Sequence, residues 1–204
     1  RFAAEPFFFA QEKKYNSKKI YADVLKYFTI LTSFIFLFVM LYLDIVIHFI
    51  GENFHNEKGI AIIPMLLMAN LFLGVYYNLS VWYKLTEKTI YGAFLAIFGA
   101  FITLLLNFIL IPKIGFVGSA WATLACYFTM MAASLLLGRK HYPIPYDLKR
   151  IFSYIFLSFV LYKLSVILET NMLVNTIYLI LFVAAVFLIE KSKKEIVSEP
   201  KLFD

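Results

Sequence analysis

The sequence predicts an all-α, polytopic membrane helix bundle with six full transmembrane helices and a truncated one at the N-terminus. The first observation is composition: 62% of the 204 residues are hydrophobic and 16% are charged, which excludes a soluble globular domain. The second is a set of six apolar runs, each close to or above the ~18–20 residues that cross a hydrocarbon core about 30 Å thick. The runs are Val24–Ile50, Ile60–Tyr83, Tyr91–Ile111, Phe116–Leu137, Ile151–Leu168 and Met172–Ile189.

The third observation is that the gaps around these runs alternate in basic charge. Fifteen Lys and Arg residues belong to gaps on one side of the predicted membrane, and two belong to the other side. By the positive-inside rule the rich side is cytoplasmic, which predicts a cytoplasmic C-terminus. The net charge of +6 therefore indicates orientation and contact with anionic lipid, with no nucleic acid as partner. We assign Lys13, Lys14, Lys18, Lys19 and Lys26 to the first rich gap.

Four segments follow from these patterns. Residues 1–12 are interpreted as the end of a truncated transmembrane helix, and residues 13–23 as a cytoplasmic Lys-rich loop. Residues 24–190 form the six-helix transmembrane bundle, and residues 191–204 form a cytoplasmic tail. Because Arg1 opens inside an apolar stretch, we expect a preceding N-terminal helix bundle of the same protein as a partner.

Aromatic, small and proline residues predict details of the six crossings. Trp82, Tyr83 and Tyr91 flank a basic gap and indicate an interfacial aromatic belt. Pro112 is expected to end the third crossing. Small residues at helical spacing predict a close seam between the third and fourth crossings, because they let helix backbones approach. The two stripes are Gly92, Ala96, Gly99, Thr103 and Asn107 on the third and Gly118, Ala122, Ala125, Thr129 and Ala132 on the fourth.

Arg1 and Glu5 are the strongest candidates for substrate binding. They lie one turn apart on one face of the truncated helix. If Glu12 is near the cytoplasmic interface, Arg1 lies ~16 Å deeper, close to the bilayer midplane. Charged groups at that depth normally face a protein interior or a water-filled path. We interpret the pair as lining a cavity; the alternative is a structural ion pair between two helices.

Three further candidates share one side of the second crossing. Asn70, Tyr77 and Asn78, together with Gly74, fall within a sector of about 100° on a helix. Such a polar and aromatic sector is suited to lining a cavity that accepts a sugar or a lipid headgroup. Contacts between neighbouring helices would use the same residue types, and the sequence leaves both interpretations open.

Signatures of enzymes are scarce, and we predict a protein that is not an enzyme. Asp44 and His48 are spaced to relay protons, which keeps open a membrane-embedded acyl- or glycosyltransferase, although simple hydration near the interface explains them as well. The single Cys126 excludes an intrachain disulfide and a cysteine metal site. His55 and its neighbouring glutamates are too loosely spaced for a metal site, so no metal and no cofactor is predicted.

Two segments resemble one family of transporters. Residues 1–9 (RFAAEPFFF) are similar to the start of the C-terminal half of Wzx-type oligosaccharide-lipid flippases, members of the MOP superfamily. Residues 107–124 (NFILIPKIGFVGSAWATL) resemble a helix–short loop–helix of the same proteins. The more specific part is the spacing of Pro112, Gly115, Gly118, Ala120, Ala122 and Thr123. The crossings would then be helices nine to fourteen of a fourteen-helix member, with residues 1–12 as the end of helix eight.

The resemblance implies a function as well as a fold. Such proteins are thought to pass undecaprenyl-diphosphate-linked oligosaccharides across the bacterial inner membrane by alternating access, for polysaccharide or lipopolysaccharide synthesis. Their two helix bundles surround a central, often cationic cavity, which Arg1 and Glu5 would face. A buried guanidinium can bind phosphate oxygens in a bidentate way. A lipid II flippase or a multidrug exporter of the same superfamily remains the alternative.

Overall fold

The computed structural model describes the backbone of residues 4–12, 15–49 and 57–198 and the side chains of residues 6–12, 15–48 and 59–191. Within these ranges every regular element is a helix, and six helices are long and apolar enough to cross a membrane. The prediction of an all-α, polytopic membrane helix bundle is therefore confirmed. The elements are α1 (Ala4–Gln11), α2 (Ser17–Leu41), α3 (Leu43–Val46), η1 (Ile47–Phe49), α4 (Glu57–Leu79), α5 (Val81–Leu85), α6 (Ile90–Ile114), α7 (Phe116–His141), α8 (Leu148–Ile167) and α9 (Met172–Ser198).

The first crossing helix lies nearer the N-terminus than the apolar run indicates. Helix α2 begins at Ser17, inside the segment expected to be a loop, and ends at Leu41. Its first turns are anchored by Tyr21, whose hydroxyl donates a hydrogen bond to the carbonyl of Phe8 at 3.0 Å. The backbone leaves the helical conformation at Tyr42 (φ −116°, ψ 30°), and the short α3 and η1 follow.

The turn between α6 and α7 depends on glycine. The expected helix end at Pro112 is wrong, because α6 continues to Ile114. Pro112 has no backbone N–H, so it removes one backbone hydrogen bond from the last turns of α6. The chain reverses at Gly115, whose φ of +64° and ψ of −146° belong to a region that is open essentially to glycine alone. At Gly118 an added Cβ would lie 2.7 Å from the backbone of Leu110, so the two helices touch directly.

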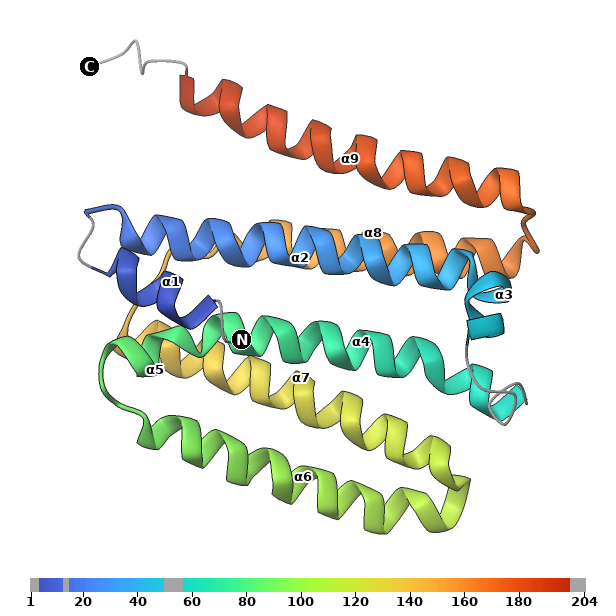
Figure 1. Ribbon diagram of the computed structural model, residues 1–204, viewed down its shortest axis with the longest axis horizontal. Helices are drawn as coiled ribbons and strands as arrows, with labels where there is room; N and C mark the ends of the chain where they lie inside the picture. The colour runs from blue at the N-terminus through green and yellow to red at the C-terminus, as the bar shows by residue number, and fades with distance from the viewer. Residues whose placement is uncertain (1–3, 13–14, 50–56, 199–204) are drawn as a thin grey trace.

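The crossing helices run along a common long axis and form two groups (Figure 1). In the first group α7 packs against both α4 and α6, and in the second group α2 packs against α8 and α9. Contacts between α2 and α4 join the groups. One of these contacts is the ring of Phe28 against Gly74, where a larger residue would overlap the ring. We call them the α4–α6–α7 group and the α2–α8–α9 group.

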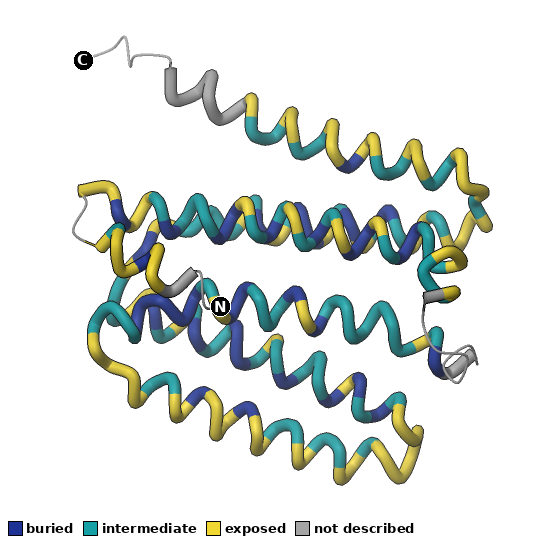
Figure 2. Tube along the Cα trace, in the orientation of Figure 1, coloured by how far each residue is buried: buried dark blue, intermediate teal, exposed yellow. Residues whose placement is uncertain are grey.

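The two outermost helices, α6 and α9, are the least buried. Figure 2 shows mostly exposed residues along both, whereas α2 and α7 carry many buried ones. In the most apolar part of each span, 44% of α2 residues are buried, compared with 11% in α6 and in α9. The exposed side chains include Phe101 and Phe108 on α6 and Phe187 on α9. Such apolar surfaces are compatible with lipid or with further helices as neighbours.

The predicted close contact between α6 and α7 is confirmed around Gly99, but one residue of the predicted stripe on α6 does not face α7. Gly99 lies against Met130 and Cys126, and the Cys126 thiol lies 3.2 Å from the Gly99 carbonyl oxygen as a weak donor. Ala122 on α7 is fully buried. Ala96, however, is exposed, while Leu95 is buried. The buried side of α6 is therefore rotated from the stripe of small residues towards Leu95.

Candidate functional site

Charged side chains of three helices meet inside the membrane-spanning segments. They lie towards the end of the bundle where α2 begins, α7 turns into α8 and α9 ends, which we call the basic end (Figure 1). Lys26 Nζ lies 2.7 Å from Glu190 Oε2, and the Tyr154 hydroxyl donates to Glu190 Oε1 at 2.7 Å. Arg150 Nη1 lies 3.6 Å from the same Oε1 atom. We call Lys26, Arg150, Tyr154 and Glu190 the charged cluster; it connects α2 and α8 to α9.

Two aspartates flank the charged cluster and add negative charge to it. Asp23 Oδ1 lies 3.6 Å from Lys26 Nζ, and Asp147 Oδ2 lies 3.1 Å from Arg150 Nε. Asp147 also caps α8, since its side chain accepts the Arg150 backbone N–H at 3.4 Å. The Lys26 side chain is 9% exposed, whereas that of Asp23 is 45% exposed. The buried ammonium is therefore neutralised mainly by Glu190, at the shorter distance.

The charged cluster corrects the interpretation of Lys26 as a gap residue. Lys26 lies inside α2, nine residues or ~14 Å along the helix from Ser17. Its Nζ also lies 4.4 Å from the centre of the Tyr27 ring, a cation–π contact. A signal for its partner was present in the sequence, because Glu190 directly follows the last apolar run and belongs to the same side of the membrane.

The chemistry of the charged cluster is that of an interhelical tie. Both carboxylate oxygens of Glu190 have a donor within hydrogen-bond distance. The Nη1 group of Arg150 is buried without a hydrogen bond, although it remains within ion-pair distance of Glu190. Removing one partner from a buried ion pair leaves an uncompensated charge, which is costly in a low-dielectric interior. The arrangement therefore couples the positions of α2, α8 and α9.

A second cluster at the basic end joins α5, α6 and α7 through aromatic rings. The rings of Trp82 and His141 stack at 5.4 Å with an interplanar angle of 13°. Trp82 Nε1 donates to Ser134 Oγ at 3.4 Å, and the Tyr91 hydroxyl lies 3.1 Å from His141 Nε2. Trp82 is 1% exposed and therefore buried between helices, while its expected interfacial depth stays a prediction. Its indole fills the space between helices, and Ser134 supplies the polar partner that a buried N–H requires.

The link between α7 and α8 is also packed. Tyr146, which lies in this link, packs against a core cluster that includes Phe8 of α1, Tyr21 of α2 and Val81 of α5. Burial raises the pKa of the Tyr146 hydroxyl far above its usual range, and the neighbouring Tyr142 adds to this shift. The hydroxyl therefore stays neutral at physiological pH.

A polar cluster ties α8, α9 and α2 together at the opposite end. Asn175 Nδ2 donates to the carbonyl of Leu41 at 2.8 Å. The Oδ1 atom of Asn175 accepts from Ser165 at 2.8 Å and from Thr170 at 2.6 Å. This amide satisfies a carbonyl at the end of α2, which has no partner within its own helix. The α2–α8–α9 group is thus held by polar contacts at both ends.

Two of the five predicted binding residues, Arg1 and Glu5, have side chains that lie outside the described residues. Arg1 lies outside the described residues. Glu5 belongs to α1, but its side chain also lies outside the described residues. Helix α1 itself packs against α2 and α5 at the basic end, with Phe8 buried against Tyr21. The cavity-lining role of Arg1 and Glu5 stays a prediction.

The other three, Asn70, Tyr77 and Asn78, all belong to the regular helix α4. Asn70 is exposed, and its amide donates to the carbonyl of Leu66 at 2.8 Å. The amide of Asn78 donates to the carbonyl of Gly74 at 3.0 Å. Tyr77 is 40% exposed. Both amides thus bond the preceding turn of their own helix, and Asn70 and Tyr77 lie at an open surface.

Asp44 and His48 do not form the pairing that a proton relay needs. His48 Nδ1 lies 2.7 Å from the backbone carbonyl of Asp44, and both residues are exposed on α3 and η1. The imidazole is therefore oriented by the main chain and not by the carboxylate. Among the described residues there is also no group of three or more His, Cys, Asp or Glu side chains placed to hold a metal ion.

Identification thus rests on the architecture. Comparison of the chain with models of known families, with curated proteins and with solved structures found no match. The helices themselves establish the broader class, because six spans of 20 to 27 residues have hydropathy values typical of bilayer crossings. The chain is a multi-pass, all-α membrane protein.

Proposed function

We propose that this chain is the C-terminal helix bundle of a transporter that flips a polyprenyl-diphosphate-linked oligosaccharide across the bacterial inner membrane. The observation that carries the proposal is the α6–α7 hairpin, which contains the segment that resembles Wzx-type flippases. Gly115 takes a conformation that favours glycine, and Gly118 lies against the backbone of Leu110. The most specific residues of the resemblance therefore occupy positions where the local geometry demands glycine.

The division into two helix groups supports transport by alternating access. Such a mechanism needs stiff units that shift relative to each other around a binding site. The α4–α6–α7 group is packed around large buried side chains, and the same core cluster reaches the other group through Leu25 of α2 and Ile155 of α8. In this proposal the basic end and the C-terminus are cytoplasmic, and no covalent chemistry takes place.

The test uses the longer protein in which the N-terminal bundle is present. Arg1→Ala is expected to lower polysaccharide export at least tenfold, since a hydrogen bond to a charged group contributes about 1.5–3 kcal/mol. Glu5→Ala is expected to lower it less. Arg139→Ala, at an exposed basic residue of α7, is the matched control and should leave export unchanged. Normal export in both the Arg1→Ala and Glu5→Ala variants, at equal protein levels, would contradict the site assignment.

Orientation is tested separately by cysteine labelling. Single cysteines in residues 53–58 are expected to react with an impermeant reagent in intact cells, whereas cysteines in residues 138–145 are not. The native Cys126 is buried and gives a low background. The reverse pattern would place the basic end outside and contradict the proposal.

Cells that carry the variants also distinguish the flippase proposal from the alternative substrates and from an enzyme. Loss of growth with intact polysaccharide export points to lipid II, and increased drug sensitivity alone points to a multidrug exporter. An acyl- or glycosyltransferase predicts loss of product on His48→Ala. The flippase proposal predicts normal export in that variant, because the contact of His48 within the described residues is with the main-chain carbonyl of Asp44.

A further inference from the structure

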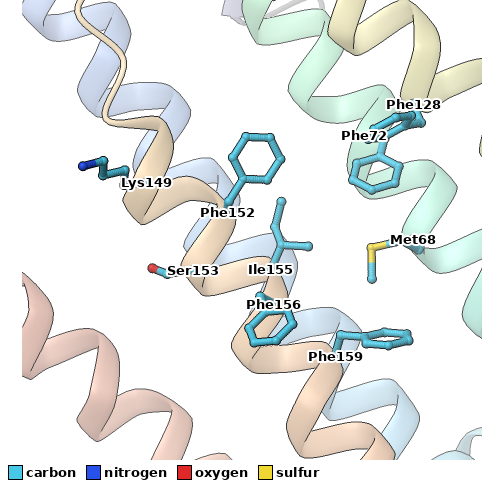
Figure 3. A pocket seen from close by; sticks show the side chains of 9 residues that line it. All are labelled: Met68, Phe72, Phe128, Lys149, Phe152, Ser153, Ile155, Phe156 and Phe159. Atoms are coloured by element: carbon cyan, nitrogen blue, oxygen red, sulfur yellow. The ribbon is translucent and has the colours of Figure 1, made fainter.

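A groove lined by aromatic and aliphatic side chains runs along α8, beside α4 and α7. Its volume is about 560 Å³, within the range of ~300–1,000 Å³ that is usual for small-molecule sites. Figure 3 shows Phe152, Phe156 and Phe159 along α8, with Met68 and Phe72 of α4 and Phe128 of α7 across from them. The three α8 rings are 40–68% exposed, so the groove is open along its length.

One end of the groove carries a positive charge. Lys149, in the first turn of α8, lines the groove at the basic end of the bundle. Figure 3 shows its ammonium group directed away from the phenylalanine rings. Among the described residues Lys149 has no hydrogen-bond or ion-pair partner, whereas the adjacent Arg150 belongs to the charged cluster. An ammonium group so placed is available to an anion outside the groove.

The length of the groove matches one leaflet of a bilayer. From Lys149 to Phe159 are ten residues of helix, or ~15 Å. Half of a hydrocarbon core about 30 Å thick is the same distance. Lys149 therefore lies at the depth of the headgroups when Phe159 lies near the midplane, and the groove follows the path of one acyl chain.

We propose that this groove is a binding site for an anionic phospholipid of the leaflet at the basic end, with its phosphate on Lys149 and an acyl chain along Phe152, Phe156 and Phe159. The site does not depend on the proposed transport function. It requires only that α4, α7 and α8 span the membrane. Charge complementarity selects the anionic headgroup, because the groove walls are otherwise almost entirely apolar.

The first experiment measures lipid binding to the purified full chain in detergent by native mass spectrometry. Phosphatidylglycerol is expected to bind more tightly than phosphatidylethanolamine. Lys149→Ala should weaken phosphatidylglycerol about fivefold, the effect of one Lys near an anionic surface (~1 kcal/mol). It should weaken phosphatidylethanolamine less, because the ammonium group of that lipid offsets the charge of its phosphate. Lys140→Ala is the matched control, since Lys140 is an exposed lysine at the same end, outside the groove. Equal losses in both lysine variants would overturn the proposal, because the attraction would then belong to the whole basic end.

A second variant tests the groove itself. Met68→Trp fills the groove and should weaken the binding of both phospholipids. The preference for phosphatidylglycerol over phosphatidylethanolamine should stay the same. If this variant fails to fold, Phe156→Trp gives an independent readout, after subtraction of the signal from Trp82 and Trp121. Its fluorescence should be quenched more by phosphatidylglycerol brominated on the acyl chains than by the matching phosphatidylethanolamine, and Lys149→Ala should abolish the difference. Equal quenching by both lipids would refute the site, and tighter binding of undecaprenyl phosphate than of phosphatidylglycerol would refute the phospholipid as its occupant.

Discussion

The helices within each of the two groups are held together by a different kind of contact. In the α4–α6–α7 group, glycines bring backbones and side chains into direct contact, as at Gly99 and Gly118, and Trp82 is buried between helices. In the α2–α8–α9 group, the charged cluster around Glu190 connects the helices at one end, and the hydrogen bonds of Asn175 connect them at the other. The first group depends on shape and the second on polar pairs.

This difference has a physical consequence in lipid. Helices surrounded by lipid tails gain little from hiding apolar surface, so close packing and polar contacts supply the attraction between them. A seam of small residues has one good fit and resists displacement. The hydrogen bonds of Asn175 can exchange partners at modest cost, whereas the buried charges around Glu190 are costly to separate. We therefore expect the α4–α6–α7 group to behave as a stiff unit and the α2–α8–α9 group to adjust more easily at its Asn175 end.

The largest effect is expected at the glycine seam. Gly118→Val places a side chain where Leu110 already lies and should destabilise the protein by about 3 kcal/mol through overpacking. Thermal unfolding in detergent measures the loss. Ala96→Val is the matched control on the exposed side of α6 and should change little. Equal stability of the two variants would show that the seam is loose and would remove the contrast between the groups.

A smaller effect is expected from breaking the charged cluster. Lys26→Met leaves Glu190 without its nearest cation and should destabilise the protein by about 2 kcal/mol, less than for a fully buried pair because Glu190 is 22% exposed. Combining it with Glu190→Gln should cost less than the sum of the two single variants, since the charges are coupled. Lys163→Met, at an exposed lysine of α8, serves as the control. Strict additivity would mean that the two charges do not interact.

Breaking the polar cluster at the opposite end of the α2–α8–α9 group should destabilise the protein less. Asn175→Ala removes the hydrogen bond to Leu41 and those from Ser165 and Thr170, and is expected to cost about 1 kcal/mol. Hydrogen exchange of α9 amides provides the measurement, because loosening of the turn should speed exchange at the start of this helix. Unchanged exchange would assign the stability of α9 to the charged cluster alone.

The smallest change in stability is expected from an exposed hydrogen bond of the α2–α8–α9 group. Tyr42→Phe removes the 2.7 Å hydrogen bond to Thr176, which is exposed. We expect a change of at most about 0.5 kcal/mol, since exposed polar groups find water instead. A loss as large as that of Asn175→Ala would indicate that this surface is covered in the native protein.

The sequence predicted most of the fold but little of the charged cluster. Long apolar runs identify crossings because each exceeds a fixed thickness of lipid, and all six are helices in the structure. Helix ends were less accurate: α2 extends back to Ser17, and α6 continues through Pro112. Hydropathy places Lys26 with the loop lysines, because it does not show that a lysine near the edge of an apolar run is paired with a glutamate 164 residues away.

By itself the sequence determined the class of protein, the number of crossings and the glycine positions of the α6–α7 hairpin. These are local properties, set by hydropathy along the chain and by backbone conformations that only glycine adopts readily. Only the tertiary structure decided which helices pair, that Glu190 joins Lys26 to Tyr154, and that Trp82 is buried between helices. Those outcomes depend on the rotation of each helix about its axis, which packing against neighbours fixes and composition does not.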